Sequence, residues 1–126
     1  MVLDKLASHL YILLTILFTV YGQIVIKLQV NAAGSLPSEA TEKIWFLFRL
    51  LLNPWVISGF ASAFLASLSW MAAISKLPLS YAYPFMSLTF VLVIILSSIL
   101  FHESITIPKA VSIGLIVVGV IVGSKG

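Results

Sequence analysis

The chain of 126 residues contains no cysteine and only two histidines, and its charged residues make up only 9% of it. Without cysteine it can form no disulfide framework and no thiolate metal site. His9 and His102 lie far apart in the sequence, and the four acidic residues add no metal-binding or catalytic pattern to them. No nucleophile–base pair and no phosphate-binding loop stands out. The sequence therefore predicts no enzyme, no cofactor and no metal site.

The chain also lacks any cluster of basic residues. Its net charge is +3, but the seven lysines and arginines are scattered along the whole length, which argues against a nucleic-acid partner. Hydrophobic residues make up 61% of the sequence, and the mean hydropathy is +1.18. A soluble domain of this size needs far more polar surface, so the composition predicts an integral membrane protein whose charges mark helix ends.

Four apolar stretches are long enough to cross a hydrocarbon core, which takes roughly 20 helical residues. They are residues 9–30, 54–75, 80–101 and 106–123. The breaks "SKLPLS" and "HESITIPK" combine proline, charge and hydroxyl groups, as turns do. The sequence thus predicts an all-α membrane protein with one four-helix transmembrane domain over residues 1–126. The first stretch is too long for a signal peptide and lacks a clean cleavage site after it, which favours a retained helix.

The connection between the first two spans has its own pattern. Ser38 is a candidate N-cap, and two glutamates follow in the first turn. Aromatic residues and leucines come next, with Lys43 and Arg49 among them. This pattern predicts an amphipathic helix over residues 38–52 that lies in the headgroup region. The alternative is an extension of the second span, but Pro54 favours a break between the two.

An even number of spans places both termini on one side of the membrane. The basic residues divide almost equally between the two sides, so they do not indicate which side is cytoplasmic. Glu39, Glu42 and Glu103 all fall on the side opposite the termini, and we therefore expect the termini to lie in the cytoplasm.

Polar residues recur at every fourth position of the first span: Tyr11, Thr15, Thr19, Gln23 and Lys27. Residues four apart share one face of a helix. Polar groups that face lipid lack partners, so we expect this stripe to face the bundle interior or a wet cavity.

Lys27 lies one turn inside the end of the first span, and His102 and Glu103 end the third span on the same side. A Lys27–Glu103 pair is therefore within reach. Two other roles stay open for Lys27: its ammonium group extends to the headgroups alone, or it holds an anion such as a lipid phosphate.

The third span contains Pro84, which removes a backbone hydrogen bond and tends to kink a helix. The carbonyl freed near Ser80 then needs a hydroxyl or water partner. Tyr83 and Ser87 share a face, and Tyr83 belongs either to the interfacial aromatic belt or to a cavity.

Small residues are spaced for close helix packing in two spans. The second span carries such a stripe from Ser58 to Ala73. In the fourth span, small residues stand four apart in two pairs: Ala110 and Gly114, and Gly119 and Gly123. We interpret both patterns as packing surfaces, and the one in the fourth span is also a candidate contact across a dimer.

Several of these motifs together resemble the small four-helix members of the drug/metabolite transporter superfamily. The closest likeness is to the subunits of the flippase for 4-amino-4-deoxy-L-arabinose-phosphoundecaprenol. The matching motifs are Gly22-Gln23 with Lys27, Ala82-Tyr83-Pro84, Ser87-Leu88-Thr89-Phe90-Val91 and His102-Glu103. The likeness covers the first span and roughly the last fifty residues, while the long first connection departs from the family pattern.

The resemblance implies that the chain helps to move a polyprenyl-phosphate-linked sugar across the bacterial inner membrane, as a homodimer or with a similar small subunit. Related cation exporters keep a glutamate in the first helix, where this chain has Thr19, and no carboxylate lies within the four spans. A small-cation or polyamine exporter and a non-transporting helper of a glycosyltransferase remain as alternatives. The candidate substrate-binding residues are Thr19, Gln23, Lys27, Tyr83, Ser87, His102 and Glu103.

Overall fold

The computed structural model describes residues 2–126, with side chains from Lys5 onward, and in this part every regular element is a helix. The helices are α1 (Val2–Ala33), α2 (Ala40–Leu51), α3 (Pro54–Ile74), α4 (Leu79–Met86), α5 (Leu88–Phe101) and α6 (Ile107–Gly123). Three helical segments are long and apolar enough to cross a membrane, namely Lys5–Ala33, Pro54–Ile74 and Leu79–Phe101. α6 is apolar but shorter. The all-α membrane fold is confirmed.

The helix bounds differ from the prediction mainly at α1 and α2. α1 has 32 residues and spans about 48 Å at 1.5 Å per residue, so it is longer than residues 9–30. α2 begins at Ala40, and its N-cap residue is Glu39, whose side chain makes no capping bond. The prediction of Ser38 as N-cap is wrong, because the chain is still extended at Glu39.

α2 and α3 are separate helices, as the proline predicted. Asn53 adopts an extended conformation between them, and its side-chain oxygen accepts a hydrogen bond from the Trp55 N–H at 2.8 Å. Pro54 then opens α3 at the first helical position, where its missing N–H costs nothing. The Asn53 amide also donates to the side-chain oxygen of Gln29, which ties this corner to α1 at 3.0 Å.

The third predicted span is not one continuous helix. The α-helix runs through Pro84 and is interrupted three residues later, at Ser87. There the backbone N–H and the hydroxyl of Ser87 both donate to the Pro84 carbonyl, and Phe90 N–H bonds the Ser87 carbonyl at 3.1 Å. These tighter bonds between residues three apart replace the α-helical pattern and divide α4 from α5.

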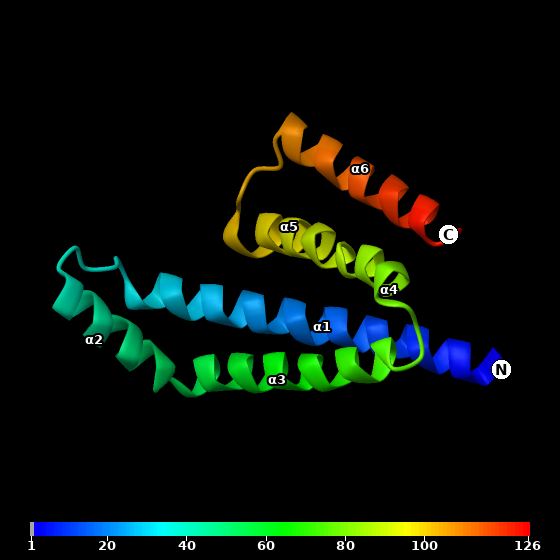
Figure 1. The fold of residues 1–126 in the computed structure, drawn as a ribbon. Coiled ribbons are helices and arrows are strands. Elements are labelled where there is room, and N and C mark those ends of the chain that lie inside the picture. Colours follow the sequence, from blue (N-terminus) through cyan, green and yellow to red (C-terminus); the bar gives the residue numbers. More distant parts are fainter. Residues whose placement is uncertain (1) are drawn as a thin grey trace.

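α1 is the central helix of the molecule (Figure 1). α3 packs along one side of it, and α4 and α5 pack along another. Within residues 2–126, α3 and α5 do not contact each other, and α6 packs only against α4 and α5. Both termini lie at one end of the molecule, while α2 and the α5–α6 loop lie toward the other end (Figure 1).

The α1–α3 interface is the closest in the molecule. The crossing point is formed by Gly22 and Gly59, where a Cβ on Gly22 would lie only 3.0 Å from the Gly59 carbonyl oxygen. One turn away, the Ser62 hydroxyl donates to the Phe18 carbonyl at 2.7 Å. Small residues thus bring the backbones together and let a side chain bond across the helices, as predicted for this stripe.

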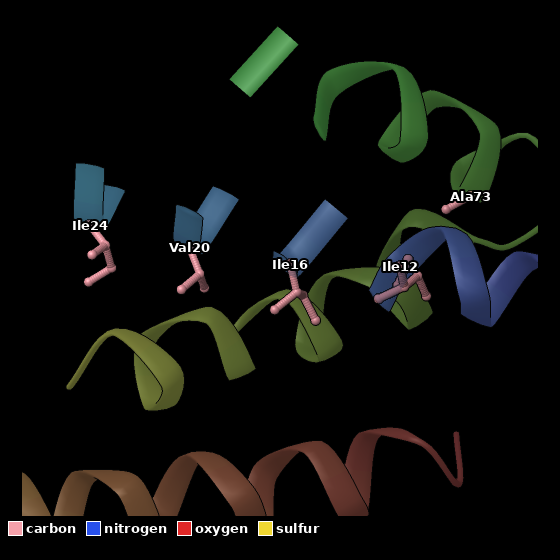
Figure 2. Close-up of a cluster of buried hydrophobic side chains, with 6 residues drawn as sticks. Ile12, Ile16, Val20, Ile24 and Ala73 are labelled. Atoms are coloured by element: carbon pink, nitrogen blue, oxygen red, sulfur yellow. The ribbon is translucent and has the colours of Figure 1, made fainter. Parts of the chain in front are cut away.

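A second face of α1 forms the apolar core. Its residues stand four apart and face α4 and α5 (Figure 2): Ile12, Ile16, Val20 and Ile24. Ala73 of α3 and Ala82 of α4 complete the cluster, and neither side chain has any exposed surface. Near the N-terminal end, the Nε2 atom of His9 and the hydroxyl of Tyr81 lie 3.0 Å apart and link α1 to α4.

Candidate functional site

Because α3 and α5 flank α1 without contacting each other, they leave a groove whose floor is α1. Two adjoining cavities make up this groove. The α5-side cavity has a volume of about 530 Å³, and its lining residues are Thr19, Gln23, Tyr83, Met86, Ser87, Thr89, Phe90 and Val93. The α3-side cavity has a volume of about 290 Å³, and its lining residues are Thr15, Thr19, Ala63, Ala66, Ser67, Trp70, Tyr83 and Met86.

Three residues line both cavities and make the groove continuous: Thr19, Tyr83 and Met86. Tyr83 also meets Trp70 edge to face, with ring centroids 5.4 Å apart, and this contact joins the α3 wall to the α4 wall. Tyr83 is 60% exposed, so its phenol ring stands in the groove rather than in the core. None of the lining residues carries a charge.

The hydroxyl groups on the floor are mostly bound to their own helix. Thr15 donates to the Tyr11 carbonyl at 2.8 Å, and Thr19 donates to the Thr15 carbonyl at 2.7 Å. Gln23 differs, because its exposed amide has no hydrogen-bond partner among residues 5–126. The Gln23 amide is thus free to bind a ligand or water in the α5-side cavity.

Thr89 is a groove residue that the sequence did not single out as a site. Its side chain is only 9% exposed, and its hydroxyl oxygen is buried without a hydrogen-bond partner among the described residues. It lines the α5-side cavity in the first turn of α5. Apart from its place in the Ser-Leu-Thr-Phe-Val motif, no sequence signal marks it, because its lack of a partner arises from the fold.

The structure thus brings four predicted site residues into one cavity: Thr19, Gln23, Tyr83 and Ser87. The polar stripe as a whole does not face the groove, because Tyr11 and Lys27 are exposed outside both cavities. At 3.6 residues per turn, each step of four advances about 40° beyond a full turn, so five such residues wrap about 160° around the helix.

His102 and Glu103, which the sequence predicted at the end of the third span, lie outside the groove. His102 ends α5 in a left-handed conformation, with φ of 55°. Glu103 lines a small separate cavity with Lys109, whose ammonium group donates to the Ser104 carbonyl at 3.3 Å. The described side chains show no ion pair within 4.0 Å, so the Lys27–Glu103 pair is not formed. Glu103 lies in the loop between α5 and α6, whereas Lys109 lies in α6.

The glycines of α6 divide between two surroundings. A Cβ on Gly123 would lie 3.3 Å from the Pro84 ring, so Gly123 packs α6 against α4. A Cβ on Gly114 or Gly119 would meet no atom within 4 Å, and Ala110 is exposed as well. Ala110 and Gly114 lie four residues apart on one exposed side of α6, whereas Gly119 points about 140° away from Gly114, so these positions do not form one face.

Three helices long and apolar enough to cross a membrane place the chain in the class of multi-pass membrane proteins. The pattern of the EamA-like transporter family matches residues 12–124, and the chain belongs to this family. No solved structure matches the chain significantly.

The chain is also similar to named proteins. It is 34% identical, over 87% of its length, to the probable 4-amino-4-deoxy-L-arabinose-phosphoundecaprenol flippase subunit ArnE of Aeromonas hydrophila, and the match covers 90% of that protein. The ArnE protein of Yersinia pseudotuberculosis is 28% identical over 93% of this chain and 96% of its own length. The flippase subunit ArnF of Pseudomonas syringae is 44% identical over 45% of this chain and 41% of its own length. These relatives are named as flippase subunits and not as enzymes.

Proposed function

We propose that the chain is a subunit of a transporter that flips a polyprenyl-phosphate-linked sugar across the bacterial inner membrane. The observation that carries this proposal is the groove itself. It has uncharged polar groups on its floor, apolar and aromatic walls, and no carboxylate among its lining residues. A proton-coupled cation exporter needs a buried acid to bind either proton or cation. The similarity to flippase subunits supports the same choice.

The groove residues have distinct roles in this proposal. Thr19, Gln23, Tyr83 and Ser87 contact the polar headgroup while the apolar tail extends into lipid between α3 and α5. Lys27 lies one turn beyond Gln23 and is exposed, so its ammonium group is available to hold the lipid phosphate. His102 and Glu103 lie at the same end of the molecule, where they stay candidate contacts for the headgroup as it enters or leaves.

The proposed membrane arrangement is one domain with four spans. α6 has 17 residues, which is at the short end of what a span requires. With α6 as the fourth span, both termini lie on one side, and we propose that this side is the cytoplasm.

We propose that α2 lies in the interface. It has no buried residues, and four of its apolar residues share one face: Ile44, Leu47, Phe48 and Leu51. Positions three and four residues apart give this single apolar stripe, which suits the boundary between headgroups and tails.

The proposed assembly is a dimer, formed with a second copy or with a similar four-helix subunit. The groove is open on its lipid side, and four helices are too few to enclose a sugar headgroup during crossing. The exposed side of α6 with Ala110 and Gly114, which stand four residues apart, suits close contact with a second subunit. The relatives' names, as subunits of one flippase, support a partner of the same kind.

The test is a flipping assay in liposomes, with the full chain reconstituted in the assembly in which it purifies. Lys27→Ala removes a charge-assisted bond to phosphate, and we expect the rate at subsaturating lipid to fall roughly 10-fold or more. Gln23→Ala should lower it as well, by roughly 2- to 12-fold. Lys125→Ala, which removes the same charge outside the helices, is the matched control.

Unchanged flipping by both variants would contradict the assigned roles. Proton release driven by added cations would favour an exporter. Retention of a glycosyltransferase with no flipping at all would favour a helper protein.

A further inference from the structure

A second polar cavity lies at the corner where α1 ends, α2 ends and α3 begins (Figure 1). Its volume is about 270 Å³. Its lining residues are Ala33, Phe46, Arg49, Leu50 and Asn53. None of them lines the groove, so this cavity is a separate site.

The Arg49 guanidinium is free to bind a ligand in this cavity. It forms no hydrogen bond with the described side chains or backbone, and no described acidic group lies within 4.0 Å of it. The nearest acidic residue in the sequence, Glu42, lies seven residues earlier, which is about 10 Å along the axis of α2. Arg49 is exposed, so its N–H donors and its positive charge are accessible to a molecule that enters the cavity.

Asn53 provides the second polar side chain of the cavity, and its neighbours hold it in place. Its side-chain oxygen accepts from the Trp55 N–H at 2.8 Å, and its amide donates to the side-chain oxygen of Gln29 at 3.0 Å. A side-chain amide has two hydrogens, so one donor remains. A free guanidinium beside a fixed amide donor suits an anion with several oxygens, such as a phosphate group. No carboxylate lines the cavity to compete with it.

The position of the cavity favours a phosphate that belongs to a lipid. Lys5–Ala33 and Pro54–Ile74 are both long and apolar enough to cross a membrane, and one ends where the other begins at this corner. The ends of spans lie at the level of the lipid headgroups. The three lining residues of α2 stand three and four positions apart, so they share a face, and this face is opposite the apolar stripe that begins at Ile44. The stripe can therefore contact lipid tails while Arg49 lies among the headgroups.

We propose that this corner binds the headgroup of an anionic phospholipid, with Arg49 as the main contact to its phosphate and Asn53 as a second donor. The planar guanidinium can donate to two phosphate oxygens at once. Phe46 and Leu50 provide apolar surface for the glycerol part, and the small volume admits a headgroup while the acyl chains stay outside. The site does not depend on which lipid is transported, because Lys27, the proposed contact for the transported phosphate, does not line it.

The experiment measures binding of three probes to the full chain in detergent by native mass spectrometry. The probes are phosphatidylglycerol, phosphatidylcholine with the same acyl chains, and inorganic phosphate. Arg49→Gln removes the charge, and Arg49→Lys keeps the charge without the planar fork. Lys43→Gln is the matched control, because it removes one positive charge from the same helix outside the cavity. Since α2 has no buried residues, all three variants should keep the wild-type circular dichroism spectrum.

We expect Arg49→Gln to weaken binding of phosphatidylglycerol by about 10-fold or more, as the loss of a hydrogen bond to a charged group does. Lys43→Gln should weaken it by about 5-fold at most, which is the general attraction of one basic residue to an anionic lipid surface. Arg49→Lys should give an intermediate loss. Wild-type protein should bind phosphatidylcholine more weakly than phosphatidylglycerol, because its headgroup carries no net negative charge, and inorganic phosphate more weakly still.

Three results would overturn the inference. Unchanged affinity of Arg49→Gln for phosphatidylglycerol would show that Arg49 does not contact the lipid. Equal losses for Arg49→Gln and Lys43→Gln would show general electrostatic attraction without a defined site. Inorganic phosphate that binds the wild-type protein as tightly as phosphatidylglycerol does would show a site for a soluble anion. Each of these results would leave the proposed function intact, because the flipping assay tests Gln23 and Lys27 instead.

Discussion

Replacement of Gly22 by alanine tests the packing that positions the groove. In the native structure Gly22 lies against Gly59, and the added Cβ would be 3.0 Å from the Gly59 carbonyl oxygen. That atom belongs to backbone and cannot move without moving α3. Overpacking of this kind typically costs about 1–3 kcal/mol, whereas a glycine-to-alanine change in a helix gains about 1 kcal/mol from conformational propensity.

Gly114→Ala separates these two contributions. Its Cβ would meet nothing within 4 Å, so only the propensity gain remains. The free energies of unfolding of Gly22→Ala and Gly114→Ala should therefore differ by about 1–3 kcal/mol, with Gly22→Ala the less stable. Gly59→Ala should fall between them, because its closest contact, at 3.1 Å, is the side chain of Ile26, which can rotate away.

The assay is reversible unfolding in mixed detergent micelles, followed by circular dichroism, at a protein concentration where sedimentation shows a monomer. The monomer condition matters because the α6 face with Gly114 is the proposed contact between subunits. Equal stability of Gly22→Ala and Gly114→Ala would refute the reasoning, since it would mean that α1 and α3 are not held at this distance.

Two further predictions concern the parts of the molecule that face lipid. Trp45 on α2 is 57% exposed. Its fluorescence should be quenched more strongly by lipids labelled near the headgroup than by lipids labelled at the tail end. The reverse order would place α2 deeper than the interface. Gly114→Cys should form a disulfide between two subunits under mild oxidation, because no atom of the described chain would cover the new side chain. Absence of the cross-link, with Lys125→Cys as the exposed control, would argue against contact through this side of α6.

The sequence predicted the helices well because their signals are local. These signals are the length of an apolar stretch, the proline at the start of α3 and the turn residues. Each acts within a few positions, and together they determine where helices form and where most of them end. Long-range geometry was harder. The four-residue repeat placed Thr19 and Gln23 correctly on a common face, but it could not show that Lys27, one turn further along, does not line either cavity.

Thr89 could not be predicted for a related reason. A threonine in a transmembrane helix ordinarily bonds its own backbone, as Thr15 and Thr19 do. The Thr89 hydroxyl has no partner among the described residues. The helix is interrupted two residues before it, at Ser87 rather than at Pro84, where the sequence indicated strain. Both the unpaired hydroxyl and the position of the interruption are properties of the fold, so only the structure shows them.

The adjacent residues Gly22 and Gln23 show how one helix builds both the packing and the site. Successive residues of a helix point about 100° apart, so Gly22 faces α3 while Gln23 faces the α5-side cavity. The close approach at Gly22 fixes α3, and the α3 residues that follow Gly59 form the other wall of the groove. A larger residue at Gly22 would push that wall outward without touching a bound headgroup. The Gly-Gln pair is therefore best understood as one unit, in which glycine sets the width of the groove and glutamine provides a polar group within it.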